Sequence, residues 1–157
     1  MTGQVDQLKN QVQIDAFNNV SLGSAGLAEG TNAHTIKTAN VLHYRIAGQA
    51  YALAATDNIA MTALALQANG TTKYYLVVIN AAGTVTLVAP PTARTGDPDT
   101  TGLLLGALPA ASAVIGIMKV VATADFTSGT TDLAGQGTFA NINSYPANGD
   151  PTVFTYA

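Results

Sequence analysis

Apolar and polar residues alternate along much of the chain after residue 33, which is the pattern of β-strands with one buried face. The first alternating stretch, 42–53, is divided by Gly48-Gln49, a pair that suits a type II′ turn because glycine stands first. Its predicted apolar face consists of Leu42, Tyr44, Ile46, Tyr51 and Leu53, with His43 and Arg45 on the opposite face. This stretch therefore predicts a β-hairpin.

Two further turns predict that the chain continues as an antiparallel meander. Asn69-Gly70, the strongest short hairpin signal, separates the alternating segment 61–67 from the segment 72–80. Segment 72–80 is apolar on both faces, as expected of a central strand that is covered on two sides. Gly83 follows where a longer hairpin turn needs a left-handed residue, and it precedes a predicted strand over 84–89.

The second half of the chain is predicted to hold a long surface loop, a buried strand and short strands near its end. Residues 89–102 contain three prolines and two glycines, which exclude a helix or a central strand. Alternation predicts a strand over 113–121, in which Gly116 indicates a bulge or a close neighbour. The tail 153–157 can add a final strand. A helix over 51–68 is an alternative because alanine is frequent there, but the Thr and Gly content favours β-structure.

The predicted fold is mainly β, an antiparallel meander that forms a small β-sandwich or barrel with an extended N-terminal arm. Residues 1–33 are assigned to the arm and a linker, and residues 34–157 to the β domain. The segment 21–32 is small and rich in glycine, which is typical of a flexible linker. The apolar spacing before it fits either a short helix over 5–12 or a strand over 12–16. Either the arm is disordered, or it orders against another subunit through Val5, Leu8, Val12, Ile14 and Phe17.

The composition argues against nucleic-acid binding and against a membrane-spanning helix. The chain has 157 residues, of which 48% are hydrophobic and 10% charged, with no cysteine and a formal net charge of -3. The six Lys and Arg residues are scattered, so no cluster is available to neutralise phosphates. No apolar run approaches the ~20 residues that a membrane helix needs, and the first residues lack the pattern of a secretory signal. We expect one domain, with no nucleic-acid or membrane partner.

Few side chains could carry chemistry, and none of them forms a recognisable motif. His34 and His43 are the only candidate general bases or nitrogen ligands, whereas a metal site needs several converging ligands. Asp97 and Asp99 share one loop and could hold a cation, as could Asp150, but solvated acids are the simpler interpretation. The absence of cysteine excludes thiolate nucleophiles. We therefore predict no catalytic residue, no metal site and no cofactor.

The tyrosines allow a second interpretation. Tyr74 and Tyr75, with Tyr44 and Tyr51 nearby in the sequence, could form a platform on which a sugar stacks. Packing in a core or an interface is the simpler use, because a sugar site also needs convergent polar groups.

Four segments resemble small structural proteins of tailed-bacteriophage virions, including head decoration (cement) proteins and fibre-like proteins. The segments are YALAATDNIAM (51–61), TTKYYLVVINAAGTVTLV (71–88), LPAASAVIGIMKV (108–120) and FTSGTTDL (126–133). The resemblance covers about half of the chain and carries no catalytic residue.

The resemblance implies a non-enzymatic virion protein made in the host cytoplasm, most readily a capsid decoration protein on the surface of a phage head. The implied partners are the major capsid protein and further copies of the chain, with a homotrimer favoured, because closed assemblies protect sheet edges. The alternative is a fibre- or spike-type module that binds a receptor or glycan through the tyrosines and the 89–102 loop.

Overall fold

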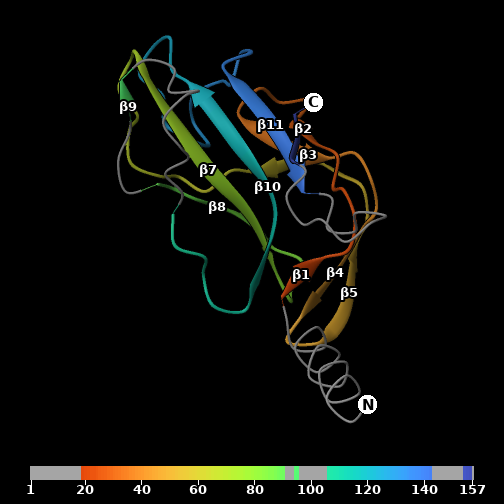
Figure 1. Cartoon of the computed structure of the whole chain (residues 1–157). Coiled ribbons are helices and arrows are strands. Elements are labelled where there is room, and N and C mark those ends of the chain that lie inside the picture. The colour runs from red at the N-terminus through yellow and green to blue at the C-terminus, as the bar shows by residue number, and fades with distance from the viewer. Residues whose placement is uncertain (1–18, 91–93, 96–105, 143–153, 157) are drawn as a thin grey trace.

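The fold consists of antiparallel strands arranged in three sheets (Figure 1). In this computed structural model, the described residues are 19–90, 94–95, 106–142 and 154–156. These residues contain no helix, and so no helix among them is long and apolar enough to cross a membrane. The prediction of a mainly β fold with antiparallel strands is confirmed.

The largest sheet has six strands, and the two longest lie side by side at its centre. These are β7 (Thr71–Asn80) and β10 (Ser112–Val121). The sheet continues beyond β10 with β11 (Gly137–Ile142) and β12 (Phe154–Tyr156), while β8 (Val85–Val88) and β9 (Arg94–Thr95) both pair with β7.

Two smaller sheets have three strands each. One has the order β1-β4-β5, with β1 (Val20–Ser21), β4 (Leu42–Ile46) and β5 (Gln49–Leu53). The other has the order β2-β3-β6, with β2 (Leu27–Glu29), β3 (Thr35–Thr38) and β6 (Thr56–Ala60).

The smaller sheets pack against one face of the large sheet, which gives the predicted sandwich its two layers. β1 and β4 contact β10, and β2 contacts β11. Alternate side chains of β7 face this main core, and the intervening ones join a second apolar cluster on the other face with Ile117 and Ala140. The first set is Tyr75, Val77 and Ile79, and the second is Tyr74, Leu76 and Val78. Burial of β7 on both faces is thereby confirmed.

The predicted hairpin over 42–53 is confirmed, but its turn lies one residue earlier than expected. Ile46 pairs with Gln49, so the turn residues are Ala47 and Gly48. Both have positive φ, 50° and 80°, as a type I′ turn requires. The expected type II′ turn at Gly48-Gln49 is therefore wrong. A type I′ turn matches the right-handed twist of the flanking strands, and Ala47 takes up the left-handed conformation that this turn requires.

Asn69-Gly70 is a turn, but it does not close the predicted hairpin. The residues 61–68 form no strand, and Gln67 instead makes an isolated bridge with Phe126. The Gly70 amide donates to the Ala122 carbonyl oxygen at 2.8 Å. The partners of segment 67–70 therefore lie beyond β10, about sixty residues away in sequence. A pattern of neighbouring residues does not reveal such a distant pairing. The alternative helix over 51–68 is not formed, since β5 and β6 occupy its first half.

The third predicted turn, between β7 and β8, is confirmed in detail. Gly83 has a φ of 78°, and its amide donates to the Asn80 carbonyl oxygen at 3.0 Å. The Asn80 side-chain oxygen accepts hydrogen bonds from the amides of Ala82 and Thr84, at 2.9 and 3.0 Å. These bonds fix the turn that forms one side of the candidate site described below.

The predicted strand over 113–121 is confirmed as β10, and Gly116 serves both purposes expected of it. The pairing with β7 shifts register between Val114 and Gly116, which is a bulge. A Cβ at Gly116 would also collide with the Leu27 side chain and would lie 2.6 Å from the Ala140 carbonyl oxygen. Glycine is therefore required where the Leu27 side chain packs against β10.

The linker predicted over 21–32 is wrong. Val20–Ser21 and Leu27–Glu29 are strands, and Ala25 and Leu27 are buried in the main core. The Leu27 amide donates to the Asn141 side-chain oxygen at 2.7 Å. Small residues that resemble a linker are here used for close packing, so the β domain begins before residue 34. Residues 1–18 lie outside the described residues.

Two predictions near the end of the chain have mixed outcomes. The tail adds the expected final strand, β12, along β11. The surface loop predicted over 89–102 is interrupted by β9, which pairs with Thr71 and Thr72 of β7. The rest of that loop, apart from Ala89 and Pro90, lies outside the described residues.

Candidate functional site

Several predicted site residues lie outside the described part of the chain. They are the arm residues Val5, Leu8, Val12, Ile14 and Phe17, and the acidic residues Asp97, Asp99 and Asp150. The predictions made for them stand as predictions.

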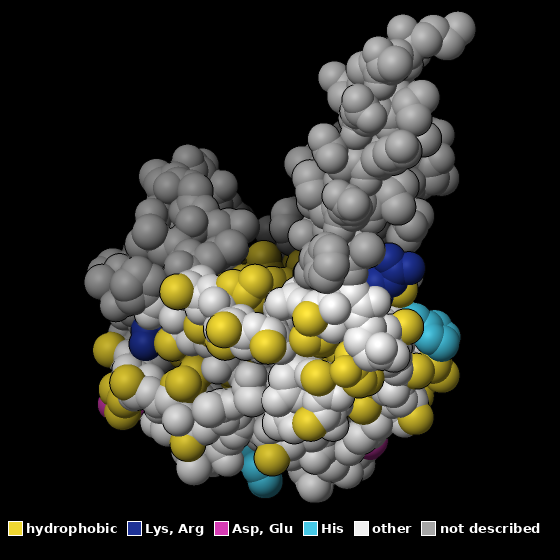
Figure 2. Space-filling view, turned by 90° about the horizontal axis from the view of Figure 1, so that it is seen from below, with side chains coloured by type: hydrophobic (Ala, Val, Ile, Leu, Met, Phe, Trp, Pro, Cys, Tyr) yellow, Lys and Arg dark blue, Asp and Glu magenta, His cyan; other side chains and the backbone are white. Residues whose placement is uncertain are grey.

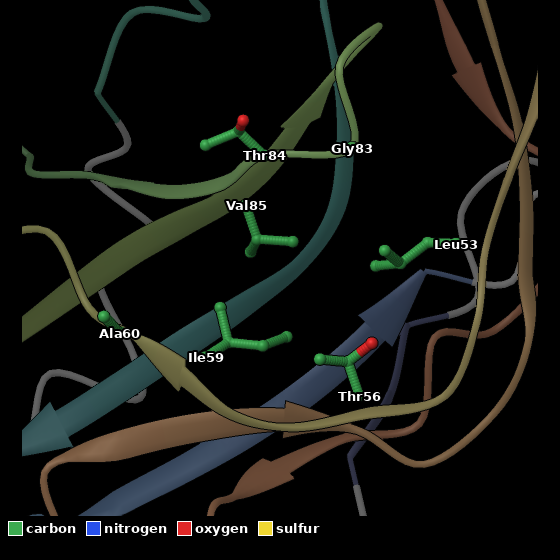
Figure 3. Close-up of a pocket in the computed structure, with 7 residues that line it drawn as sticks. All are labelled: Leu53, Thr56, Ile59, Ala60, Gly83, Thr84 and Val85. Atoms are coloured by element: carbon green, nitrogen blue, oxygen red, sulfur yellow. The ribbon is translucent and has the colours of Figure 1, made fainter.

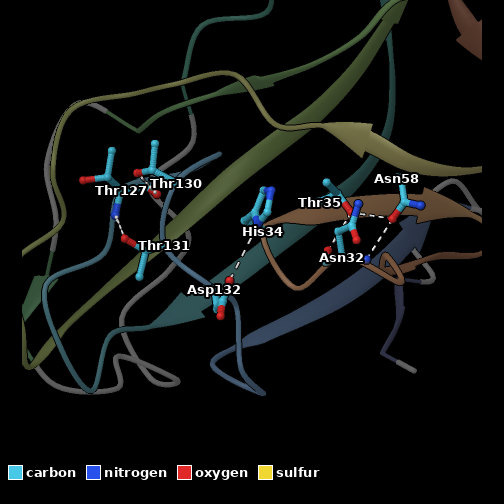
Figure 4. Close-up of polar contacts among 8 residues, drawn as sticks. All are labelled: Asn32, His34, Thr35, Asn58, Thr127, Thr130, Thr131 and Asp132. Carbon is cyan, nitrogen blue, oxygen red and sulfur yellow. Dashed lines mark hydrogen bonds and ion pairs between the residues drawn. The ribbon is translucent and has the colours of Figure 1, made fainter.

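The two histidines lie on different segments, and among the described residues neither belongs to a cluster of metal-binding side chains. His34 is half exposed, and its Nδ1 lies 3.6 Å from Asp132 Oδ1, also exposed (Figure 4). His43 is exposed on β4, on the face opposite Tyr44, as predicted. Figure 4 shows that the threonines at 127, 130 and 131 bond among themselves and not to the His34–Asp132 pair. The described residues contain no group of three or more His, Cys, Asp or Glu side chains that could hold a metal ion.

The tyrosines do not form one platform. Tyr74 and Tyr75 are both buried and enter different apolar clusters on the two faces of β7. Tyr44 and Tyr51 stack across the β4–β5 hairpin with ring centroids 5.5 Å apart, and Tyr44 is fully buried. Packing in the core, the simpler of the two predicted uses, accounts for Tyr44 and Tyr75.

A buried polar network stabilises the core beside Tyr75. The Tyr75 hydroxyl donates to Gln67 Oε1 at 3.0 Å, and Gln67 Nε2 donates to the carbonyl oxygens of Thr71 and Val120, each at 2.9 Å. Every polar atom of the Gln67 side chain therefore has a partner although the residue is fully buried. Burial raises the pKa of Tyr75 to about 12. This network holds loop 61–68 on the sheet, which is a structural role.

The candidate site is a pocket of about 370 Å³ between the three sheets (Figure 3). Its lining comes from the ends of β5, β6 and β8 and from the turn before β8. The lining residues are Leu53, Thr56, Ile59, Ala60, Gly83, Thr84 and Val85. In Figure 3 the side chains of Leu53, Ile59 and Val85 point toward one another across the pocket. The lining is apolar with two hydroxyl groups and contains no charged residue.

The pocket lies where the last strands of all three sheets meet. Among the described residues, β5 ends the first small sheet, β6 ends the second, and β8 ends the large sheet. Strands at a sheet edge carry N–H and C=O groups that can pair with another chain. Sequence patterns do not reveal this site, because it depends on how three separate edges are brought together.

Tyr44 anchors one wall of the pocket. Its hydroxyl donates to the Asn80 carbonyl oxygen at 3.1 Å, which ties the β7–β8 turn to the β1-β4-β5 sheet. A Cβ placed at Gly83 would lie 3.8 Å from both the Tyr44 hydroxyl and Leu53 Cδ1, so these groups pack closely behind the lining. Burial, and secondarily the nearby Tyr51, raises the pKa of Tyr44, so the protonated hydroxyl that donates this bond is favoured to higher pH than in an exposed tyrosine.

Asp57 fixes the opposite wall, which β6 provides. Its carboxylate accepts hydrogen bonds from the Thr31 hydroxyl and from the amides of Thr31 and Asn58, at 3.0 and 2.7 Å for the amides. These bonds, the Thr31 hydroxyl first, hold the pKa of Asp57 below its usual value. Asn58 Oδ1 also accepts from the Asn32 amide at 2.8 Å, beside Thr35 (Figure 4). The strand that carries Ile59 and Ala60 is thus fastened to the β2–β3 turn.

One face of the molecule is poor in charge (Figure 2). Figure 2 shows hydrophobic side chains spread among uncharged ones over one face, with isolated basic, acidic and histidine side chains. Such a surface suits contact with protein better than contact with a charged ligand, because the centres of protein interfaces are depleted of charged residues. No protein-family model, curated protein or solved structure matches the chain.

Proposed function

We propose that the chain is a non-enzymatic structural protein of a bacteriophage virion, most readily a decoration protein that stabilises the head by binding the major capsid protein. The observation that carries this proposal is which segments of the sequence line the pocket. All seven lining residues belong to two of the segments that resemble virion proteins, 51–61 and 71–88. An uncharged contact site is thus built from the same residues that carry the resemblance.

The remaining chemistry of the described residues supports a structural role. The exposed His34–Asp132 pair has no nucleophile bonded to it, and the buried polar groups at Gln67 and Tyr75 satisfy one another. A protein that binds only the assembled shell stabilises it by mass action, without any catalytic group. In this proposal copies of the chain associate, with a trimer favoured, and cover part of the head surface.

The test uses particles of the virus that encodes the chain, prepared with and without it. Purified full-length chain is added to the deficient particles, and its binding is measured by co-sedimentation. Heat-induced release of DNA is then followed with a dye. We expect the chain to bind and to raise the temperature at which the particles open. Particles that neither bind the chain nor gain heat resistance would overturn the proposal.

A fibre- or spike-type glycan-binding module receives less support, since Tyr44, Tyr74 and Tyr75 are buried. A glycan array with the full chain separates the two functions. Binding to a defined glycan, together with no binding to particles, would replace the decoration proposal with this one.

A further inference from the structure

We propose that the pocket between β5, β6 and β8 binds the N-terminal arm of a second copy of the chain, with apolar side chains of residues 12–17 entering it. This inference rests on that part of the proposed function in which copies of the chain associate, and it does not require the capsid. Its occupant is a named segment of the chain itself, and the pocket, the arm and the direction of β1 each support that choice.

The pocket has the properties of a receptor for an apolar segment. Its volume, about 370 Å³, lies within the range of about 300–1,000 Å³ that is usual for binding pockets. Leu53, Ile59 and Val85 supply its apolar contacts, and the hydroxyl group of Thr56, which also lines it, already donates to the Ala54 carbonyl oxygen at 2.8 Å. A charged segment would lose hydration there without gaining a partner.

β8 is an end strand of the large sheet, and its first residue lines the pocket. Its Leu87 amide donates to the Thr62 hydroxyl at 3.2 Å, so a side chain covers that part of the edge. Val85 lies two residues closer to the turn and lines the pocket. Peptides commonly bind proteins by adding a strand to such an edge while alternate side chains fill pockets.

The N-terminal arm matches this receptor. Eighteen residues precede Asn19, and fully extended they would span about 60 Å, which is enough to reach a neighbouring molecule. The stretch 12–17, VQIDAF, carries one charge, and Val12, Ile14 and Ala16 alternate as a strand requires. Its composition therefore suits an uncharged pocket at a strand edge.

The direction of β1 favours a second copy over the chain's own pocket. Ser21 pairs with Tyr44 and Val20 with Arg45, so toward the N-terminus the chain moves along β4 to the β4–β5 turn. The Asn19 side-chain oxygen accepts from the Ala47 amide at 2.7 Å at that turn. Leu53 of the pocket pairs with Leu42, at the opposite end of the same hairpin. An arm that continues the course of β1 thus moves away from its own pocket.

The experiment uses cross-linking between differently tagged full-length chains, which is clean because the natural chain has no cysteine. One chain carries Ile14→Cys, and the other carries Ala60→Cys at the exposed rim of the pocket. The matched control is Ala124→Cys, also exposed, beyond the Val121 end of β10. Val121 pairs with Thr72, at the end of β7 opposite the Gly83–Thr84 turn that lines the pocket.

We expect a short bismaleimide to join Ile14→Cys to Ala60→Cys several-fold more than to Ala124→Cys. Equal yields would overturn the inference. Efficient coupling within a single chain carrying both Ile14→Cys and Ala60→Cys, with no product between chains, would also overturn it, because the arm would then occupy its own pocket.

A second measurement does not depend on cross-linking. Ala60→Glu places a charge at the pocket rim without disturbing a buried position, and Ala124→Glu is its control. We expect sedimentation velocity to show self-association weakened by about tenfold or more for Ala60→Glu alone. Unchanged association would contradict the inference. Unchanged self-association of Ala60→Glu, together with normal binding of the chain to phage particles, would overturn this inference and leave the proposed function standing. Cross-linking of the arm to the pocket of a second copy, without binding to particles, would overturn the capsid proposal and leave this inference standing.

Discussion

The Tyr44 hydroxyl donates a hydrogen bond to the Asn80 carbonyl oxygen at 3.1 Å, and this bond joins two sheets that share no strand. Tyr44 lies in the middle of β4, whereas Asn80 ends β7, one of the two longest strands of the large sheet. The pocket wall formed by Gly83 and Leu53 lies directly beside this contact. The bond therefore links the packing of the core to the shape of the candidate site.

Replacing Tyr44 by phenylalanine should lower the free energy of unfolding by about 1 kcal/mol, the usual net value of one such hydrogen bond. The stacking on Tyr51 is retained, so the change isolates the hydroxyl. Chemical denaturation at fixed protein concentration measures the loss. Tyr51→Phe is the control and should change stability by less than about 0.5 kcal/mol. Equal effects of the two substitutions would show that the bond to Asn80 contributes nothing.

Gln67→Leu should be more damaging, by about 2 kcal/mol, because it leaves the buried Tyr75 hydroxyl without its acceptor and removes the Gln67 donor from the carbonyl oxygens of Thr71 and Val120. A double-mutant cycle with Tyr75→Phe tests the network directly. We expect the two substitutions to be non-additive by about 1 kcal/mol, measured from denaturant midpoints. Additive effects would mean that the two side chains act independently.

The parts of the fold that the sequence predicts are those encoded by neighbouring residues. Segment 72–80 has a two-sided apolar pattern that only a covered strand satisfies, and Gly83 marks a turn that is closed by local hydrogen bonds to Asn80. Gly116 indicated a bulge or a close neighbour, and the structure contains both. In each case the signal lies in the local sequence, although Leu27 and Ala140, which crowd Gly116, are distant along the chain.

The parts that it does not predict depend on distant partners. Asn69-Gly70 has the composition of a hairpin turn, yet Gln67 makes an isolated bridge with Phe126, beyond the end of β10. Ala25 and Leu27 lie in a glycine-rich stretch typical of a linker, and they are buried because β2 packs against β11. The pocket forms only when the end strands β5, β6 and β8 of three separate sheets come together, so no single sequence motif could indicate it.

Gly116→Ala should destabilise the protein by about 2 kcal/mol, because the added methyl group overlaps the Leu27 side chain and the Ala140 carbonyl oxygen. Thermal and urea unfolding measure the loss. Gly23→Ala is the matched control, since a Cβ there meets no atom within 4 Å, and its effect should be below about 0.5 kcal/mol. A tolerated Gly116→Ala would mean that β2 and β10 are not packed this closely.

Asp57 should make stability fall in acid. Its pKa is lowered in the folded state, so its contribution is fully present above the pKa of the unfolded chain and is lost as pH falls through the folded pKa. Asp57→Asn should therefore lower the urea midpoint at about pH 7 and have a smaller effect at about pH 2.5. A difference between the two proteins that stays constant over this range would contradict the assignment.

Tyr75 should produce the opposite dependence in alkali. Its pKa is raised from 10.0 to about 12 by burial, so the folded state favours the neutral phenol. The resulting stability is complete below pH 10 and is lost as pH rises toward the folded pKa, because the unfolded chain releases this proton first. Tyrosinate absorbance, followed alongside circular dichroism, should show Tyr75 titrating late or together with unfolding, while Tyr44, whose pKa burial also raises, is a second described tyrosine that titrates above the usual range. Tyr75→Phe should remove that late step, and if the step remained, a tyrosine other than the one bonded to Gln67 would be responsible.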